Sequence, residues 1–197
     1  MRSGDRAVTR ADTLRLRWLT VIIFVMAVLT VGWPLINIAV PNRRTLTSGT
    51  ILTLGPSQAD LARLTVGPGW SMVPSQTDPR LDYVLRRGHV ELAISYVALI
   101  DRAQTAHLWT GLRQVMEVSN PGVRLGRPSA FKTAQGRRGA QGALASSTDI
   151  GTAAVVGNPS GTFAVEMVLV SPRRASRANL AAARELMRSL RMVVPPR

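Results

Sequence analysis

Ser129 and Lys132 stand three residues apart, the spacing at which a lysine can activate a serine hydroxyl as a nucleophile. That chemistry also requires the serine at a helix start, with partner groups in Ser-Asp-Asn and Lys-Thr-Gly sequences. Here Ser129 follows Pro128 in a stretch with strand character, and Lys132 is the only lysine of the chain. The pattern therefore predicts a hydroxyl at a strand edge and no catalytic residue, so we expect a protein that is not an enzyme.

Metal-ligating side chains are scarce, because the chain has two histidines, His89 and His107, and no cysteine. A metal site needs three or four converging ligands, and Glu91 and Asp101 are the carboxylates near these histidines in sequence, without a recognisable ligand spacing. The missing thiols exclude disulfides, thiolate zinc sites and thiolate-held iron–sulfur clusters. We expect neither a metal ion nor another cofactor.

Arginines occur in three adjacent pairs, at predicted turns or at a predicted helix start. The six residues are Arg86, Arg87, Arg137, Arg138, Arg173 and Arg174. Paired guanidinium groups can bind phosphate, lipid headgroups or an acidic protein surface, although turns are also where solvated charges normally lie. Aromatic residues make up only 5% of the chain, which argues against a nucleic-acid partner. The pairs are candidate contacts for an anionic partner.

Two tryptophans are candidates for a ligand groove. Trp70 follows the Gly-Pro-Gly turn at 67–69, and Trp109 lies beside Leu108 and Leu112 in a predicted helix. An indole ring at such positions is more typical of a core anchor than of a ligand platform. Both interpretations of Trp70 and Trp109 stay open at this point.

The chain is long enough for one ordinary domain and a segment of another kind, with 197 residues of which 46% are hydrophobic and 18% charged. Residues 19–40 form an uncharged, apolar run, and a helix of that length spans the hydrocarbon core of a bilayer. Trp18 and Trp33 lie near its two ends, as interfacial aromatic residues do. The run predicts a transmembrane helix at 19–40.

Basic residues flank this run asymmetrically. Before it lie Arg2, Arg6, Arg10, Arg15 and Arg17, with Asp5 and Asp12, whereas the far flank has only Arg43 and Arg44. The flank with more basic residues stays in the cytoplasm. We therefore expect a basic cytoplasmic tail at 1–18, a single span of the cell membrane, and an extracytoplasmic location for the residues after Arg44. A cleaved signal peptide is the competing interpretation, but the run exceeds the usual length and no small-x-small cleavage site follows it.

After a linker at 41–49, residues 50–193 carry the patterns of one α+β domain, followed by a tail at 194–197. Alternating apolar residues between turn sequences predict strands at 50–54, 62–66, 70–73, 82–86, 89–98, 129–134, 141–147, 151–156 and 162–170. The order of strands, helix, strands and helix predicts an antiparallel sheet packed with two helices.

Apolar residues at helical spacing predict these two helices. The first stripe follows an N-cap at Asp101 and comprises Leu108, Leu112, Val115 and Met116. The second helix starts at Ser171 and Pro172, and its stripe comprises Leu180, Ala183, Leu186, Met187 and Leu190.

The sequence Leu-Thr-Val-Gly-Pro-Gly-Trp at 64–70 precedes paired strands, a helix, a Gly-rich strand pair and a C-terminal Leu-Met-Arg-Ser-Leu helix. In this order of elements the chain resembles the Mog1/PsbP-like superfamily, whose actinobacterial envelope members share the Pro-Gly-Trp turn. The resemblance covers about residues 50–193 and implies an α/β/α sandwich used for binding, in a membrane-anchored actinobacterial protein. It carries over no functional residue.

These observations favour a single-pass, membrane-anchored protein of a bacterial cell envelope, whose outer domain binds without catalysis. The expected partners are the membrane itself and an envelope protein or anionic lipid. A second hypothesis is a carrier or sensor that holds a small amphiphile or lipid between sheet and helix. A third, an envelope hydrolase, lacks a nucleophile, base and orienting group that the sequence can connect.

Overall fold

The computed structural model describes residues 42–56, 61–99 and 105–193. In these ranges no helix is long and apolar enough to cross a membrane. The predicted span at 19–40 and the predicted tail at 1–18 lie outside the described residues. So does the predicted N-cap at Asp101.

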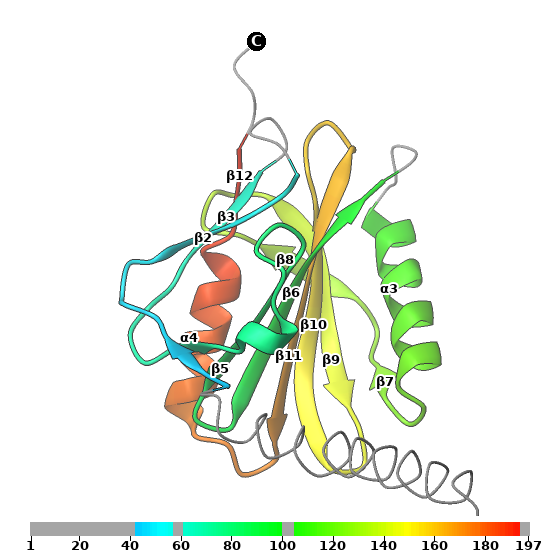
Figure 1. The fold of residues 1–197 in the computed structure, drawn as a ribbon. Helices are drawn as coiled ribbons and strands as arrows, with labels where there is room; N and C mark the ends of the chain where they lie inside the picture. Colours follow the sequence, from blue (N-terminus) through cyan, green and yellow to red (C-terminus); the bar gives the residue numbers. More distant parts are fainter. Residues whose placement is uncertain (1–41, 57–60, 100–104, 194–197) are drawn as a thin grey trace, which may run out of the picture. The chain divides into compact units, whose positions relative to one another are not determined.

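The larger sheet of the described residues is antiparallel and has nine strands (Figure 1). They are β1 (Arg44–Thr45), β4 (Ser71–Met72), β5 (Asp82–Arg87), β6 (Val90–Ala98), β7 (Arg124–Leu125), β8 (Ser129–Lys132), β9 (Arg138–Ala145), β10 (Asp149–Gly157) and β11 (Phe163–Pro172). Their order is β1-β4-β5-β6-β11-β10-β9-β7, and β8 pairs with another part of β9. The long central strands β6, β11, β10 and β9 form the platform on which both helices pack.

A second sheet and two α-helices complete the described fold. The remaining elements are β2 (Ile51–Leu54), β3 (Ala62–Thr65), a 3-10 helix η2 (Pro74–Gln76), α3 (Thr105–Ser119), α4 (Arg177–Arg188) and β12 (Arg191–Met192). The small sheet has the order β12-β3-β2. The two helices flank the large sheet on opposite sides, α4 on the left and α3 on the right in Figure 1. The expected antiparallel sheet with two helices is confirmed, and the second sheet is an addition to it.

Alternation along the strands divides the core between the two faces of the large sheet. On β6, Val90, Leu92 and Ile94 are fully buried and belong to the cluster shared with α4 and the small sheet. A second cluster on the other face includes Trp109 and Leu112 of α3. Burial of both faces by apolar side chains supplies the main driving force for this arrangement.

A glycine on β9 lets α3 approach the sheet closely. A Cβ added at Gly142 would lie 2.7 Å from Cζ2 of Trp109, which is too close for any side chain. The Trp109 ring is 3% exposed and belongs to the α3-side core. The pair Gly142 and Trp109 therefore sets where α3 lies over the sheet.

Three local expectations were wrong. The second helix does not start at Ser171 and Pro172, because these residues extend β11 opposite Ile150 and Asp149, and Ser171 is 1% exposed in that strand. The helix begins five residues later, at Arg177. Val115, expected in the first buried stripe, is 59% exposed. Residues 44–45, expected in a linker, form β1 because they pair with β4.

Candidate functional site

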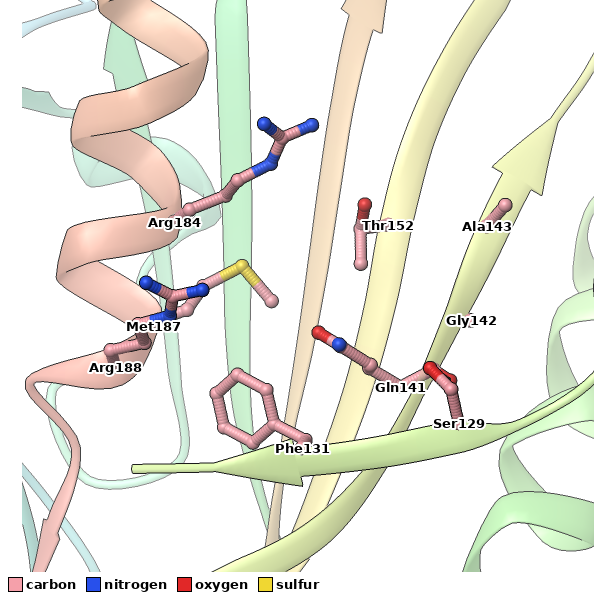
Figure 2. A pocket seen from close by; sticks show the side chains of 9 residues that line it. All are labelled: Ser129, Phe131, Gln141, Gly142, Ala143, Thr152, Arg184, Met187 and Arg188. Carbon is pink, nitrogen blue, oxygen red and sulfur yellow. The ribbon is translucent and has the colours of Figure 1, made fainter. Parts of the chain in front are cut away.

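Helix α4 packs against β6 of the large sheet and leaves β8, β9 and β10 partly uncovered on the same face. The hollow between α4 and these strands, here named the α4 groove, has a volume of about 380 Å³ (Figure 2). It is lined by Ser129, Phe131, Gln141, Gly142, Ala143, Thr152, Arg184, Met187 and Arg188.

The helix contributes two cations to the α4 groove. Arg184 and Arg188 are four residues apart in α4, so their side chains leave the same face one turn apart. Met187 is buried beside them in the core. In Figure 2 the Arg184 side chain reaches from α4 toward the strand that carries Thr152. Neither guanidinium forms an ion pair with a carboxylate of the described residues, and no lining residue is acidic.

The strands contribute hydroxyl and amide groups. Register pairs Ser129 with Gln141 across β8 and β9, and Ala143 with Thr152 across β9 and β10. The Ser129 hydroxyl donates to the backbone carbonyl of Gln141 at 3.3 Å, and the Gln141 amide nitrogen donates to the carbonyl of Ala130 at 3.4 Å. These contacts hold the polar side chains at the groove, across from the arginines in Figure 2.

A neighbouring hollow of about 410 Å³ continues the α4 groove and adds a third cation. It shares Phe131, Gln141 and Arg188 with the groove, and its wall includes Lys132 of β8. The Phe131 ring is 5% exposed and gives this end an apolar wall. Arg184 and Arg188 thus line the α4 groove, Arg188 and Lys132 line the neighbouring hollow, and none of the lining residues of either hollow is acidic.

This arrangement presents hydrogen-bond donors that suit an anion. Arginine is not deprotonated in proteins, and the groove holds no histidine or carboxylate that could act as a base. Ser129 and Lys132 stand three residues apart in strand β8, so their side chains leave opposite faces of the strand, and the Ser129 hydroxyl donates to a backbone carbonyl. Within the described ranges, no three metal-ligating side chains gather. Guanidinium and hydroxyl donors together suit phosphate, sulfate or carboxylate groups.

No family model matches the sequence, and no curated protein matches it. Among solved structures, the cyanobacterial PsbP protein CyanoP from Synechocystis sp. PCC 6803 aligns with a TM-score of 0.50 and 12% identity, over 75% of this chain and 95% of that chain. The domain has the Mog1/PsbP-like fold. The Ran-binding protein Mog1p of Saccharomyces cerevisiae aligns with a TM-score of 0.45 and 13% identity, over 75% of this chain and 97% of that chain. At 12% identity the likeness to CyanoP concerns the fold alone.

The three predicted arginine pairs do not form one patch in the Mog1/PsbP-like domain. The pair at 86–87 ends β5, and Arg86 Nη2 lies 2.6 Å from Glu91 Oε2 in an ion pair. The pair at 173–174 follows β11 at the same end of the sheet, since Glu91 is in register with Val170. The pair at 137–138 lies at the opposite end, where β9 begins. None of the three pairs lines the α4 groove.

Both candidate tryptophans lie in the core of the Mog1/PsbP-like domain. Trp70 is 1% exposed and packs in the cluster on the α4 side, while Trp109 is 3% exposed on the α3 side. The edge of Trp70 reaches a separate hollow that Arg87 also lines. A ring that is buried in this way holds the core together and offers little surface to a ligand.

Sequence reasoning missed Arg184 and Arg188. Their spacing beside the apolar stripe at 183–190 was a readable signal, because it places two cations at the border of a buried helix face. No local sequence pattern predicts the wall of the α4 groove that the strands form. Ser129, Gln141 and Thr152 meet only because β8, β9 and β10 pair in the observed register, which no local pattern specifies.

Proposed function

We propose that the chain is a membrane-anchored binding protein of a bacterial cell envelope, whose domain holds an anionic group of its partner in the α4 groove and performs no chemistry. The observation that carries this proposal is the pair Arg184 and Arg188, which form no ion pair with a described residue and line the same groove as the hydroxyl and amide groups of the strands. An ion pair with a phosphate, sulfate or carboxylate would satisfy the guanidinium donors. The actinobacterial source implied by the sequence resemblance is part of the same proposal.

Anchoring by residues 19–40 rests on their apolar length and on the basic residues that precede them. It places the α4 groove near envelope components and supports an anionic lipid or an envelope protein as the partner. Either partner, an anionic lipid or an envelope protein, would present the same kind of anionic group to the α4 groove. An experiment must therefore report which kind of molecule is captured.

The binding site can be tested by photo-crosslinking in intact cells that carry the full chain. A photoreactive amino acid in place of Ala143, on the floor of the α4 groove, should capture a molecule with an anionic group. The variant Arg184→Gln with Arg188→Gln should lower the capture at least tenfold, because each lost charge-assisted hydrogen bond is worth about 1.5–3 kcal/mol. Mass spectrometry of the captured species separates a lipid from a protein partner.

The matched control is Arg173→Gln with Arg174→Gln, which removes the same charge outside the α4 groove. We expect this control to capture as much as the unchanged chain. Equal capture by the groove variant and the unchanged chain, or capture of an uncharged molecule alone, would contradict the proposed anion site. Higher salt should also weaken the capture, since exposed charges are screened over about 8 Å at physiological ionic strength.

The proposed topology gives a separate expected result. Protease added to spheroplasts that express the full chain should digest the residues after Arg44 and leave the tail at 1–18 protected. Detection with tags at both ends by immunoblotting measures the two fragments. A fully protected domain in intact spheroplasts that becomes digestible after lysis would refute this orientation.

A further inference from the structure

Helix α3 leaves part of its own sheet face uncovered. It packs over β7, β9 and β10, so β6 and β11 are only partly covered and border a second hollow, the α3 groove. Its volume is about 470 Å³, within the range of small-ligand sites. Most of its wall is apolar, with Leu112, Val115, Met116, Val123, Leu144, Val168 and Val170 among the lining residues.

One carboxylate lies in the apolar floor of this groove. Glu166 is in the middle of β11, in register with Ser95 of β6, and its side chain lines the α3 groove. The same strand face continues with Val168 and Val170, so the position is one where an apolar residue would fit the pattern. Glu166 is partly buried, and burial raises the pKa of its carboxyl above the ordinary value of 4.5.

Glu166 differs from the other two carboxylates of the α3 groove. Glu91 forms an ion pair with Arg86, and an Asp149 oxygen accepts a hydrogen bond from the Thr148 hydroxyl at 2.6 Å. The Glu166 carboxylate has neither an ion pair nor a hydrogen bond with any described residue. Partial burial of an unpaired charge lowers stability, and a cationic ligand would remove that penalty.

The charge balance of the protein makes this groove unusual. The chain carries a net charge of +14, and its basic residues far outnumber its acidic ones. Yet three carboxylates, Glu91, Asp149 and Glu166, line the α3 groove and no basic residue does, and the ion pair with Arg86 neutralises Glu91 but not the other two. The charge of this groove is thus opposite to that of the α4 groove on the other face, so the two grooves select different ligands.

We propose that the α3 groove binds a small cationic amphiphile, with the apolar part of the ligand against Leu112, Met116 and Val168 and its amine or guanidinium group paired with Glu166. The site is separate from the α4 groove and does not depend on the proposed function. An apolar wall supplies affinity in proportion to the buried area, and the carboxylate supplies selection for positive charge.

The test uses the full chain in phosphatidylcholine nanodiscs, titrated calorimetrically with hexylguanidinium after subtraction of empty nanodiscs. Hexylguanidinium should bind at least tenfold more tightly than hexanol or hexanoate. Shortening the chain to butylguanidinium should weaken binding by about fourfold for each CH₂ removed. Glu166→Gln should lower the affinity for hexylguanidinium at least tenfold and leave the affinity for hexanol unchanged.

The matched control is Glu117→Gln on α3, where the carboxylate is exposed, outside the groove and 4.0 Å from Arg113. This variant should bind hexylguanidinium as tightly as the unchanged chain. Equal binding of hexanol and hexylguanidinium, unchanged binding by the Glu166 variant, or no heat above that of empty nanodiscs would overturn the proposal. Preference for a basic peptide over all alkyl cations would also overturn it.

Thermal unfolding separates lost binding from lost folding. Because burial raises the pKa of Glu166 in the folded state, the favourable contribution of this group to folding stability is fully present below about pH 4.5. That contribution is lost as the pH rises through the folded pKa. Glu166→Gln should therefore raise the unfolding temperature at pH 7, and this gain should disappear at acid pH. The charged groups on or beside this face include Glu91 with Arg86, Asp82 and Asp149 on the strands, Arg113 with Glu117 on α3, and Arg43 in the hollow next to Glu91. The substitution changes none of them. A variant less stable than the unchanged chain at pH 7 would contradict the account of Glu166.

Discussion

Trp70→Ala is expected to lower the free energy of unfolding by about 3–5 kcal/mol, the range for removal of a buried aromatic side chain. The Trp70 ring is 1% exposed in the core beneath α4, and its backbone carbonyl accepts a hydrogen bond from the Leu46 amide at 2.9 Å. A loss of that size is a large share of the stability of an ordinary domain. Urea denaturation followed by circular dichroism measures it.

The control for this result is Val118→Ala. Val118 is an apolar residue of α3 that is 82% exposed, so its replacement should change the free energy of unfolding by less than about 0.5 kcal/mol. A Trp70→Ala protein that keeps its stability but loses partner binding would show that the indole ring is a ligand contact. The amphiphile carrier would then be favoured over the anion-binding protein.

Gly151→Ala is expected to cost about 3 kcal/mol, the upper end for overpacking of a core. Gly151 pairs with Val170 across β10 and β11, and a Cβ at this position would overlap the backbone carbonyl of Leu169. A carbonyl in the ladder cannot turn away as a flexible side chain can, so the two strands would have to separate. Thermal unfolding of the purified variant measures the loss.

A second glycine gives a matched control of opposite sign. Nothing lies within 4 Å of a Cβ added at Gly111 in α3, and its φ is not in the left-handed region. Alanine is favoured over glycine by about 0.5–1 kcal/mol inside a helix, so Gly111→Ala should raise the stability. If Gly151→Ala and Gly111→Ala changed the free energy of unfolding equally, β10 and β11 would not pair in solution as closely as they do in the structure.

Short-range patterns predicted most of the elements. The alternation in β6 placed Val90, Leu92 and Ile94 on one buried face, and the helical spacing near the C-terminus placed Leu186 and Met187 in the core. These predictions succeed because burial of one face depends only on the period of the chain. The turn at Gly88, where φ is 59°, was also readable because glycine tolerates that conformation.

Long-range pairing could not be predicted. Ser171 and Pro172 have the composition of a helix start, yet they end β11 because Ile150 and Asp149 stand opposite them. The α4 groove depends on contacts between β8, β9 and β10, and on how much of the sheet α4 covers. No sequence pattern points to Glu166, because its carboxylate lacks a partner only as a result of which residues lie beside it on the neighbouring strands. Such properties belong to the assembled sheet and not to any local sequence.

The most direct test of an anion site in the α4 groove is nuclear magnetic resonance of labelled arginine side chains. The sample is the full chain in phosphatidylcholine nanodiscs, and it is titrated with glycerol phosphate. We expect the Nε–H signals of Arg184 and Arg188 to shift together and saturably, while those of Arg173 and Arg174 stay in place. Saturable shifts confined to the arginine pairs at 86–87, 137–138 and 173–174, with Arg184 and Arg188 unmoved, would contradict the proposed anion site.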